Sequence, residues 1–448
     1  MTTSKSGESE PALPSPYNWW WHPEKSWTDM LFCFICYLFM PLHKMITSSS
    51  SPSSRESSNA RKTKERARSL MRDGAIKNAK YVSIPKWCAA AKAPIFECKY
   101  LIPRVPLLET WGLSEHITDG FCNKESVEVF IRFPSSVYRF HDSEDKDDSN
   151  IPPDQFQKNE IGCHEMPNID LSRLSTDVPF LIHFFGGGMT IGSHSDADGM
   201  TIAHSVAEFH TKDPRFVFAC VSYSQSPEFP FPTAVEEALT AVSHLLDKLP
   251  NHKKIFISGC SAGANLATVV TFEMHRRYPG RIRAACILCP MLNPAANSLS
   301  YYLNQNSLFI SVDWLRWCWQ VYLGLAQPQA STIDPNKSTR QDQLNLGSNH
   351  DAWESSPHRK GKYARLVNPT LGLPPQLNEP HAPKFLVTTN EGDPLRDDGL
   401  DLVQKLIAEG AQVRHLSHKG SHWIGTSLDK KSFQELVQAF VDLLYPID

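Results

Sequence analysis

The chain contains the stretch Ile255-Phe256-Ile257-Ser258-Gly259-Cys260-Ser261-Ala262-Gly263-Ala264-Asn265-Leu266-Ala267. It begins as a short apolar run rich in β-branched and aromatic residues, which predicts a buried strand. After Gly263 it continues with helical length available as far as His275. A serine between two glycines, placed between a strand and a helix, is typical of a nucleophile elbow, in which the serine backbone is strained and the turn leaves no room for side chains. Ser261 is therefore a candidate nucleophile.

The composition of the chain limits its possible domain organisation, partners and metal content. The chain has 448 residues, a hydrophobic content of 41% and a net charge of −3. This length could hold two domains, but α/β enzymes of this size are commonly one domain with additions. The small net charge gives no reason to expect a nucleic acid as partner. The 11 cysteines are scattered, which indicates reduced thiols. Two CxxC pairs, Cys33/Cys36 and Cys286/Cys289, lie in apolar runs that favour core packing over zinc, so we expect no metal.

Residues 1–46 differ in composition from the rest of the chain. They contain the cluster Trp19-Trp20-Trp21 and a continuous apolar run over residues 30–40. This run is shorter than the roughly 20 residues of a membrane-spanning helix and lacks the features of a secretory signal. Tryptophans beside a short apolar run fit an interfacial anchor on a membrane. A helix packed against the enzyme is the alternative.

Residues 47–80 are predicted to be a linker, first serine-rich and then basic. The basic run is either a solvated helix face or, directly after an anchor, a segment that favours anionic lipid and the cytoplasmic side. We therefore expect a membrane-associated protein, for example at the endoplasmic reticulum, with its catalytic domain in the cytoplasm. A cytoplasmic protein is the alternative.

Residues 81–448 are predicted to form one catalytic domain. Strands are expected at 127–133, 179–185, 216–223, 284–289, 384–389 and 412–416, and helices at 233–249, 314–323, 400–408 and 430–444. Their alternation implies an α/β fold, with a mainly parallel sheet covered by helices on both faces. The acidic segment at about 141–176 is predicted to be a surface loop. The long excursion at about 295–381 is predicted to be a cap over the site.

A nucleophilic serine needs a base to take its proton and an acid to orient that base. After an elbow serine the expected order is an acid and then a histidine. Asp393 follows the strand at 384–389, and His422 follows the last strand. These two residues are predicted to complete a triad with Ser261. Three residues nearby compete for these roles, and each has a surface ion pair as its default explanation: Glu391, Asp397 and His418.

An oxyanion needs backbone N–H groups that already point at it. The loop Gly186-Gly187-Gly188 follows a buried strand, and its uncrowded backbone can supply such donors. We expect them from Gly186 and Gly187, with a further N–H from Ala262 at the start of the elbow helix. A phosphate-binding loop is the alternative for three glycines, but no Gly-Lys-Ser/Thr follows.

Together these motifs resemble the hormone-sensitive-lipase-like branch of the α/β-hydrolases, which includes arylacetamide deacetylases. The matching pieces run in order from about Gly120 to the C-terminus: Gly186-Gly187-Gly188-Met189, Tyr223 with Pro227-Glu228, Gly259-Cys260-Ser261-Ala262-Gly263, Leu373-Pro374-Pro375 and Asp393-Pro394-Leu395-Arg396-Asp397. The resemblance implies an α/β-hydrolase fold and hydrolysis of small lipophilic carboxylic esters through an acyl-enzyme. It also implies no cofactor, and a cap built partly from about 81–120.

The chain departs from the family pattern at the glycine loop. The family has a histidine directly before the glycines, where this chain has Phe185. Phenylalanine has no donor or acceptor, so it cannot hold the loop by a hydrogen bond. His183, on the same face of the strand, either replaces it or is a buried histidine bonded to neighbouring backbone. We expect a loop held by packing rather than by a polar clamp, and modest turnover.

Two functional classes remain. One is a serine esterase or deacylase. The other is a small-ligand receptor on the same scaffold, because the branch that the chain resembles also contains plant hormone receptors that lack the catalytic histidine. His422 is present in this chain and favours the enzyme.

Overall fold

The computed structural model describes most of the chain from residue 75 onward. The described residues are Ser69, Asp73, 75–104, 125–140, 156–195, 197–209, 214–305, 307, 310–325, 344–345, 347–422 and 430–446. The predicted anchor and most of the predicted linker at 47–80 lie outside these residues. The described end of that segment, residues 75–80, is helical rather than an extended linker, and Ala79 is buried.

A nine-stranded sheet forms the centre of the described fold, in the order β3-β1-β2-β5-β4-β6-β7-β8-β9. The strands are β1 (Ile95–Pro103), β2 (Ser126–Pro134), β3 (His164–Glu165), β4 (Phe180–Phe184), β5 (Val217–Ser222), β6 (Ile255–Cys260), β7 (Ala284–Leu288), β8 (Lys384–Asn390) and β9 (Val413–His418). Strand β2 is antiparallel to both of its neighbours, and all other pairs are parallel. This confirms the predicted mainly parallel sheet.

The central strands are buried along their whole length. Every residue of β4, β6 and β7 is buried. This burial explains why these strands are continuous apolar runs in the sequence, since helices on both faces leave no side that needs polar residues. The predicted strands at 127–133, 179–185, 216–223, 284–289, 384–389 and 412–416 are confirmed within one or two residues at each end.

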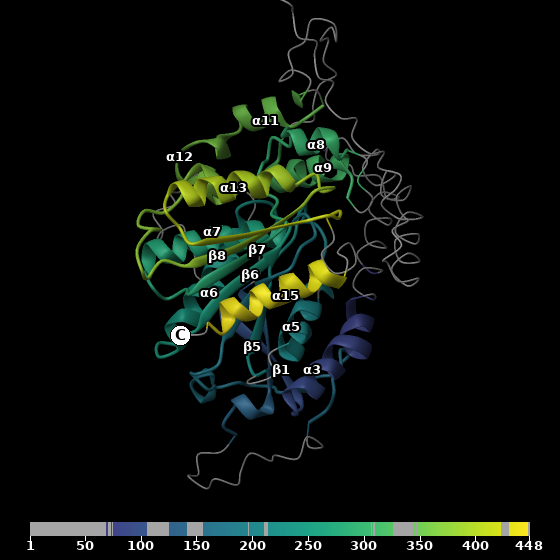
Figure 1. The fold of residues 1–448 in the computed structure, drawn as a ribbon, viewed down its shortest axis with the longest axis vertical. Helices are drawn as coiled ribbons and strands as arrows, with labels where there is room; N and C mark the ends of the chain where they lie inside the picture. The colour runs from purple at the N-terminus through teal and green to yellow at the C-terminus, as the bar shows by residue number, and fades with distance from the viewer. Residues whose placement is uncertain are drawn as a thin grey trace, which may run out of the picture.

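Helices cover both faces of the sheet. They are α3 (Ile84–Ala91), α5 (Ala197–Phe209), α6 (Thr233–Lys248), α7 (Ala262–Arg277), α8 (Leu299–Leu303), α9 (Val312–Leu323), α11 (His350–Ser355), α12 (Gly361–Val367), α13 (Arg396–Ala408) and α15 (Lys430–Leu444), with η2 (Ala79–Ser83) leading into α3. Helices α3, α5 and α15 pack together on one face, and α6 and α7 pack together on the other (Figure 1). This is the arrangement that right-handed crossovers between parallel strands produce.

Helices α8, α9 and α11 gather at one end of the sheet, at the top of Figure 1. Helix α8 and the residues after it contact the loop that follows β8, where Asn304 Nδ2 donates to the carbonyl of Asp393 (3.0 Å). Helix α9 contacts the loop that follows β4, because a Cβ added at Gly188 would lie 2.7 Å from the Trp314 ring. These helices belong to the predicted cap segment at 295–381.

Two segments differ from the sequence-based prediction. Part of the segment at 81–120, expected in the cap, forms β1, which pairs with β2 along its whole length, so this part belongs to the sheet. Residues 105–124 lie outside the described residues. The predicted surface loop at 141–176 contains the short strand β3, which pairs with β1, and it buries Ile161 and Cys163.

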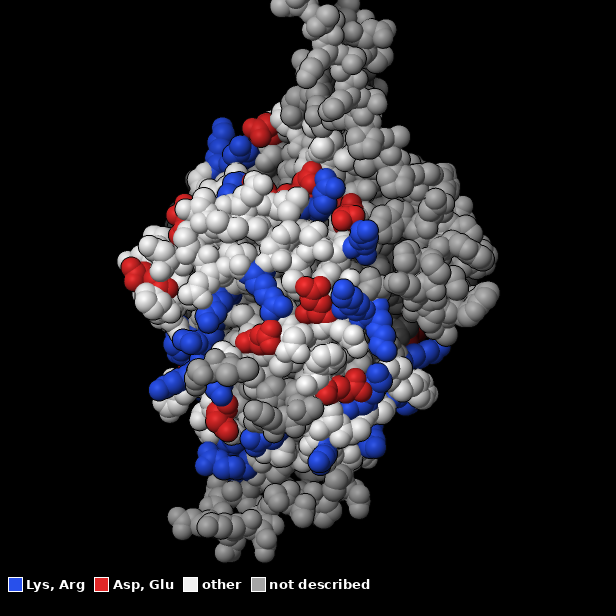
Figure 2. Space-filling model, in the orientation of Figure 1, with Lys and Arg blue, Asp and Glu red and all other residues white. Residues whose placement is uncertain are grey.

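The described surface carries charges of both signs. Lys and Arg side chains alternate with Asp and Glu across the face seen in Figure 2, as the small net charge of the chain leads one to expect. Among the described residues, no helix combines the length and apolar character needed to cross a bilayer. The described cysteines are all free thiols. Of the CxxC pairs, Cys286 and Cys289 lie buried at β7, whereas Cys33 and Cys36 fall outside the described residues.

Candidate active site

Ser261 lies at the turn between β6 and α7, as the sequence predicts. Its backbone has φ 57° and ψ −120°, a strained conformation for a residue with a side chain. Neighbouring glycines make the turn sterically possible: a Cβ at Gly263 would lie 2.1 Å from the carbonyl oxygen of Phe184. The Ser261 N–H donates to the carbonyl of Leu288 in β7 (2.9 Å), which fixes the turn against the next strand. The elbow is therefore built into the middle of the sheet.

Asp393 and His422 meet at the same end of the sheet, after β8 and β9. Nδ1 of His422 lies 2.8 Å from Oδ2 of Asp393. Both side chains are buried, and the exposed fractions of His422 and Asp393 are 7% and 0%. The other carboxylate oxygen of Asp393 accepts the Leu395 N–H (2.8 Å). A hydrogen bond from Nδ1–H to Asp393 leaves Nε2 as the basic nitrogen of the imidazole.

The loops that carry these two residues are tied to each other by backbone contacts. The Glu391 N–H donates to the carbonyl of His418 (2.9 Å), and the Gly392 N–H donates to the carbonyl of Gly420 (2.8 Å). The side-chain amide of Asn390, the last residue of β8, donates to the carbonyl of Ser421 (2.6 Å). Asp393 thus directly follows three residues that are hydrogen-bonded to the segment just before His422.

The three competing residues lie elsewhere. Asp397 accepts hydrogen bonds from Arg396 Nε (2.9 Å) and from the Ser300 N–H (2.7 Å), so it anchors α8. Glu391 is exposed, and His418 is buried as the last residue of β9. Among these acids, the carboxylate hydrogen-bonded to His422 is that of Asp393.

The glycine loop lies directly beside the serine. A Cβ added at Gly186 would be 3.3 Å from the Cβ of Ser261. Gly187 has φ 116°, and its carbonyl accepts the N–H groups of Thr190 and Ile191 (3.0 Å each), which closes the loop. Ala262 is the first residue of α7, where a helix leaves its N–H groups unpaired. Within the described part of the chain, the N–H groups of Gly186, Gly187 and Ala262 donate no hydrogen bond and remain available to a ligand.

The structure separates the roles of His183 and Phe185. Nδ1 of His183 is 2.8 Å from the hydroxyl of Ser258 in β6, and its Nε2 faces α5, where a Cβ at Gly199 would lie 2.7 Å away. His183 is thus buried between β6 and α5, and the hydroxyl of Ser258 on β6 is one of its hydrogen-bond partners. The Phe185 ring stacks on Tyr223, and the Tyr223 hydroxyl donates to the Phe185 carbonyl (2.8 Å). The loop is therefore packed, as predicted, but it also has a polar tie.

Sequence reasoning missed a buried acid near Asp393. Asp398, in the first turn of α13, accepts the N–H groups of Leu292 and Asn293 (2.9 Å each), which follow β7. Burial raises the pKa of Asp398 from 3.8 to about 7, and the nearby carboxylates of Asp393 and Asp397 also act to raise it. Its place in the run Asp393-Pro394-Leu395-Arg396-Asp397-Asp398 was the available signal, but the run does not tell which acid is buried.

Comparison with known proteins supports the fold and shows the family of the chain. A family model described as the α/β-hydrolase fold matches residues 181–423, more than half of the chain. The chain is 26% identical over 286 residues to 3-O-acetylpapaveroxine carboxylesterase of Papaver somniferum, a match covering 59% of this chain and 78% of that one. It is 24% identical to neutral cholesterol ester hydrolase 1 of Bos taurus, in a match that covers 52% of this chain and 64% of the bovine protein. The chain thus spans less than two thirds of the length of this relative. The solved esterase of Pyrobaculum calidifontis superposes with a TM-score of 0.52 at 17% identity, covering 85% of this chain and 92% of that one, which supports the fold.

The chain therefore belongs to the α/β-hydrolases. Within them it falls in the hormone-sensitive-lipase-like branch, a class of carboxylic ester hydrolases.

Proposed function

We propose that this protein hydrolyses carboxylic esters of lipophilic substrates through an acyl-enzyme formed on Ser261. The observation that carries the proposal is the buried Asp393–His422 hydrogen bond of 2.8 Å, formed at the same end of the sheet as the strained elbow serine. A buried histidine with its Nδ1 bonded to a carboxylate is oriented to act as a general base.

In the first half of the reaction, Nε2 of His422 takes the proton of Ser261 Oγ while the oxygen attacks the ester carbonyl. Asp393 holds the imidazole in one tautomer and stabilises the imidazolium that forms. The negative charge on the former carbonyl oxygen is stabilised by the N–H groups of Gly186, Gly187 and Ala262. Each such donor is worth on the order of a hundredfold to a thousandfold in rate.

The tetrahedral intermediate then expels the alcohol, which takes the proton from His422. In the second half, His422 removes a proton from water as the water attacks the acyl-enzyme. The second tetrahedral intermediate then breaks its bond to Ser261 Oγ, which takes that proton back from His422, and the carboxylic acid is released. The chemistry uses only groups of the chain and water, so we propose that no cofactor takes part.

The proposal of a lipophilic substrate is supported by helix α9, which packs next to the glycine loop. Helix α9 carries Trp314, Trp317 and Trp319, and the Trp314 ring contacts the loop at Gly188. An aromatic ring against the glycine loop favours an apolar acyl or alcohol group. The name of the bovine relative, a cholesterol ester hydrolase, points the same way and to a role in lipid metabolism.

A small-ligand receptor on the same scaffold is the second candidate. The receptors of this branch lack the catalytic histidine, whereas His422 is present here and is paired with Asp393. The pair therefore favours an enzyme.

The activity is tested with a chain-length series of p-nitrophenyl esters on the full chain, with Ser261→Ala beside it. We expect turnover in the wild type and a loss of at least about a thousandfold in Ser261→Ala. Ser355→Ala, an exposed serine on α11, is the matched control and should behave as the wild type. Saturable binding of the esters without turnover in the wild type would contradict the enzyme and favour the receptor.

We also propose that the N-terminal segment, residues 19–40, holds the enzyme on a membrane surface with the catalytic domain on the cytoplasmic side. The support is the sequence alone: a tryptophan cluster, a short apolar run and a basic run after it. The full chain should float with anionic lipid vesicles, and the variant Leu31→Asp/Phe34→Asp/Leu38→Asp should not. If the variant floats equally well, or if it loses esterase activity in detergent, the segment has another role.

A further inference from the structure

The segment 185–192, which follows β4 and contains the glycine loop, is hydrogen-bonded at three points to the segment 223–226, which follows β5. The Tyr223 hydroxyl donates to the Phe185 carbonyl (2.8 Å), and the Gln225 side-chain amide donates to the Gly192 carbonyl (2.9 Å). The Ser226 N–H donates to the carbonyl of Met189 (2.7 Å). The loop after one central strand is thus held at its start, middle and end by the loop after the neighbouring strand.

The tie at the start of the loop is also a ring contact. The rings of Phe185 and Tyr223 stack with centroids 4.2 Å apart and an interplanar angle of 12°. Both residues are buried, with exposed fractions of 1% and 3%. Aromatic pairs in a stacked arrangement attract each other beyond the apolar area that they bury. Tyr223 therefore contacts Phe185 in two ways: its ring stacks on the Phe185 ring, and its hydroxyl donates to the Phe185 carbonyl.

The carbonyl that Tyr223 holds belongs to the same peptide unit as the N–H of Gly186. A trans peptide is planar, so its C=O and N–H point in opposite directions and turn together. Fixing the Phe185 carbonyl therefore fixes the direction of the Gly186 N–H. The backbone of Gly186 lies against Ser261, where a Cβ at Gly186 would be 3.3 Å from the Ser261 Cβ. The Tyr223 hydroxyl thus fixes the direction of the Gly186 N–H, which lies beside Ser261.

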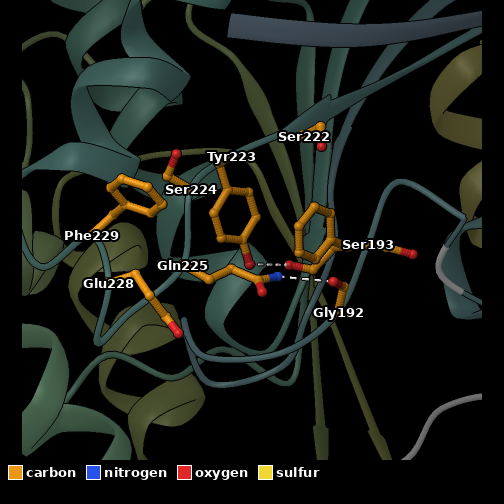
Figure 3. Close-up of a pocket in the computed structure, with 9 residues that line it drawn as sticks. Gly192, Ser193, Ser222, Tyr223, Ser224, Gln225, Glu228 and Phe229 are labelled. Atoms are coloured by element: carbon orange, nitrogen blue, oxygen red, sulfur yellow. Dashed lines mark hydrogen bonds between the residues drawn. The ribbon is translucent and has the colours of Figure 1, made fainter. Parts of the chain in front are cut away.

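A cavity of about 350 Å³ borders this contact. It is lined by Phe185, Gly192, Ser193, Tyr223, Gln225 and neighbouring residues, and Ser261 does not line it (Figure 3). Figure 3 shows Tyr223 and Gln225 side by side along it, each bonded to the glycine loop. The cavity leaves open space on one side of this peptide, whereas its other side lies close to the elbow, where a Cβ at Gly263 would be 2.3 Å from the Phe185 carbonyl. On the open side, the hydrogen bond from the Tyr223 hydroxyl is the contact that orients the Phe185 carbonyl.

We propose that Tyr223 is a positioning residue for the oxyanion site: its stacked ring and its hydroxyl orient the Phe185–Gly186 peptide so that the Gly186 N–H faces the oxyanion formed on Ser261. The inference rests on the proposed esterase function. It explains how a chain with phenylalanine before the glycines keeps a defined oxyanion loop, since the polar tie comes from the neighbouring loop instead of from the side chain at that position.

The decisive variant is Tyr223→Phe, which keeps the ring and removes only the hydroxyl. On a short-chain p-nitrophenyl ester, kcat should fall about tenfold to a hundredfold while KM changes less than about threefold, since the lost interaction serves the transition state. The affinity for a trifluoromethyl ketone, whose adduct with Ser261 carries an oxyanion, should fall by the same factor as kcat/KM. The affinity for a substrate-like amide, which forms no oxyanion, should stay unchanged.

Tyr445→Phe is the matched control. The Tyr445 hydroxyl also donates to a backbone carbonyl, that of Arg215 (2.8 Å), far from the site. Both variants should lose similar stability, but only Tyr223→Phe should lose kcat and affinity for the ketone. If Tyr223→Phe does not fold, Phe185→Leu removes the stacked ring and keeps the carbonyl, and it should show a partial loss in the same two readouts.

Two failures are distinguishable. If Ser261→Ala keeps its activity in these assays, the proposed function itself is wrong. If Ser261→Ala is inactive but Tyr223→Phe has wild-type kcat and wild-type affinity for the ketone, the esterase function stands and the role of Tyr223 is overturned. That role is likewise overturned if Phe185→Leu, tested in its place, has wild-type values in both readouts.

Discussion

Nδ1 of His422 lies 2.8 Å from Oδ2 of Asp393, and the two residues are 29 positions apart in the sequence. The contact depends on the pairing of β8 with β9, which brings Asn390 opposite His418 and places the two following loops together. Backbone hydrogen bonds from Glu391 and Gly392 continue this pairing past the ends of the strands. The acid and the histidine are therefore positioned by the sheet itself.

The first prediction concerns the acid of the pair. Asp393→Asn should lower kcat on a p-nitrophenyl ester by on the order of a thousandfold to ten-thousandfold, because an amide favours the wrong tautomer of His422. Asp397→Asn is the control: its carboxylate bonds Arg396 and the Ser300 N–H, so the loss should be below about tenfold. Equal losses in the two variants would contradict the assignment of Asp393.

The second prediction concerns the packing of the elbow. In Gly263→Ala the new Cβ would lie 2.1 Å from the Phe184 carbonyl and 2.3 Å from the Phe185 carbonyl, both backbone atoms that cannot move freely. We expect a loss of more than about 3 kcal/mol in the free energy of unfolding, or no soluble protein. Gly361→Ala, at φ 62° with open space around it, should cost only about 1–2 kcal/mol. Urea denaturation of both variants measures the difference, and a stable, active Gly263→Ala would show that the turn is not as tight as described.

The third prediction concerns His183. His183→Ala leaves the Ser258 hydroxyl without its buried partner and should lower the free energy of unfolding by about 1–3 kcal/mol. Turnover should change less than about threefold, because the imidazole faces α5 rather than the glycine loop. Phe185→His, assayed beside it on the same short-chain ester, tests whether a histidine before the glycines speeds turnover. A folded His183→Ala variant without most of its activity would mean that His183 does hold the loop.

The fourth prediction is a pH dependence of stability. The folded-state pKa of Asp398, about 7, lies above its ordinary value of 3.8, so the folded chain binds this proton more tightly than the unfolded chain. The resulting stabilisation is complete below about pH 4 and is lost as the pH rises through about 7, at up to about 1.4 kcal/mol per pH unit.

Asp398→Asn should remove that loss. Relative to the wild type, the variant should be more stable at pH 7.5 than at pH 4.5, because its side chain stays neutral and can still accept the N–H groups of Leu292 and Asn293. Asp401→Asn, a half-exposed acid on the same helix, is the control and should show no such trend. Parallel pH profiles for the wild type and Asp398→Asn, from urea denaturation, would contradict the raised pKa.

The sequence was most informative where local chemistry decides the structure. Short apolar runs predicted the central strands because these are buried on both faces, and the glycines around Ser261 predicted the elbow because only glycine fits there. Asp393 and His422 could be chosen because both follow predicted strands, at the edge of a parallel sheet where strand ends meet. Whether they act as a catalytic pair stays a prediction.

What the sequence did not reveal depends on partners far along the chain. Strand β1 contains Glu97, which looks like a surface residue but is buried because it pairs with Arg132, 35 positions away in β2. The hydrogen bond from the Tyr223 hydroxyl to the Phe185 carbonyl joins residues 38 positions apart. Because its acceptor is a backbone group, no pattern of side chains in the sequence predicts it. Asp398 is buried by the loop after β7, whereas its neighbour Asp397 contacts Ser300 and Arg396.

The nucleophilic role of Ser261 is tested most directly by locating a fluorophosphonate adduct on the full-length protein by mass spectrometry. Trypsin releases residues 255–276 as one peptide, which contains both Ser258 and Ser261, and fragmentation of that peptide separates the two sites. The account predicts one adduct, on Ser261, and no labelling of this peptide in Ser261→Ala. An adduct on another residue, or undiminished labelling of Ser261→Ala, would contradict it.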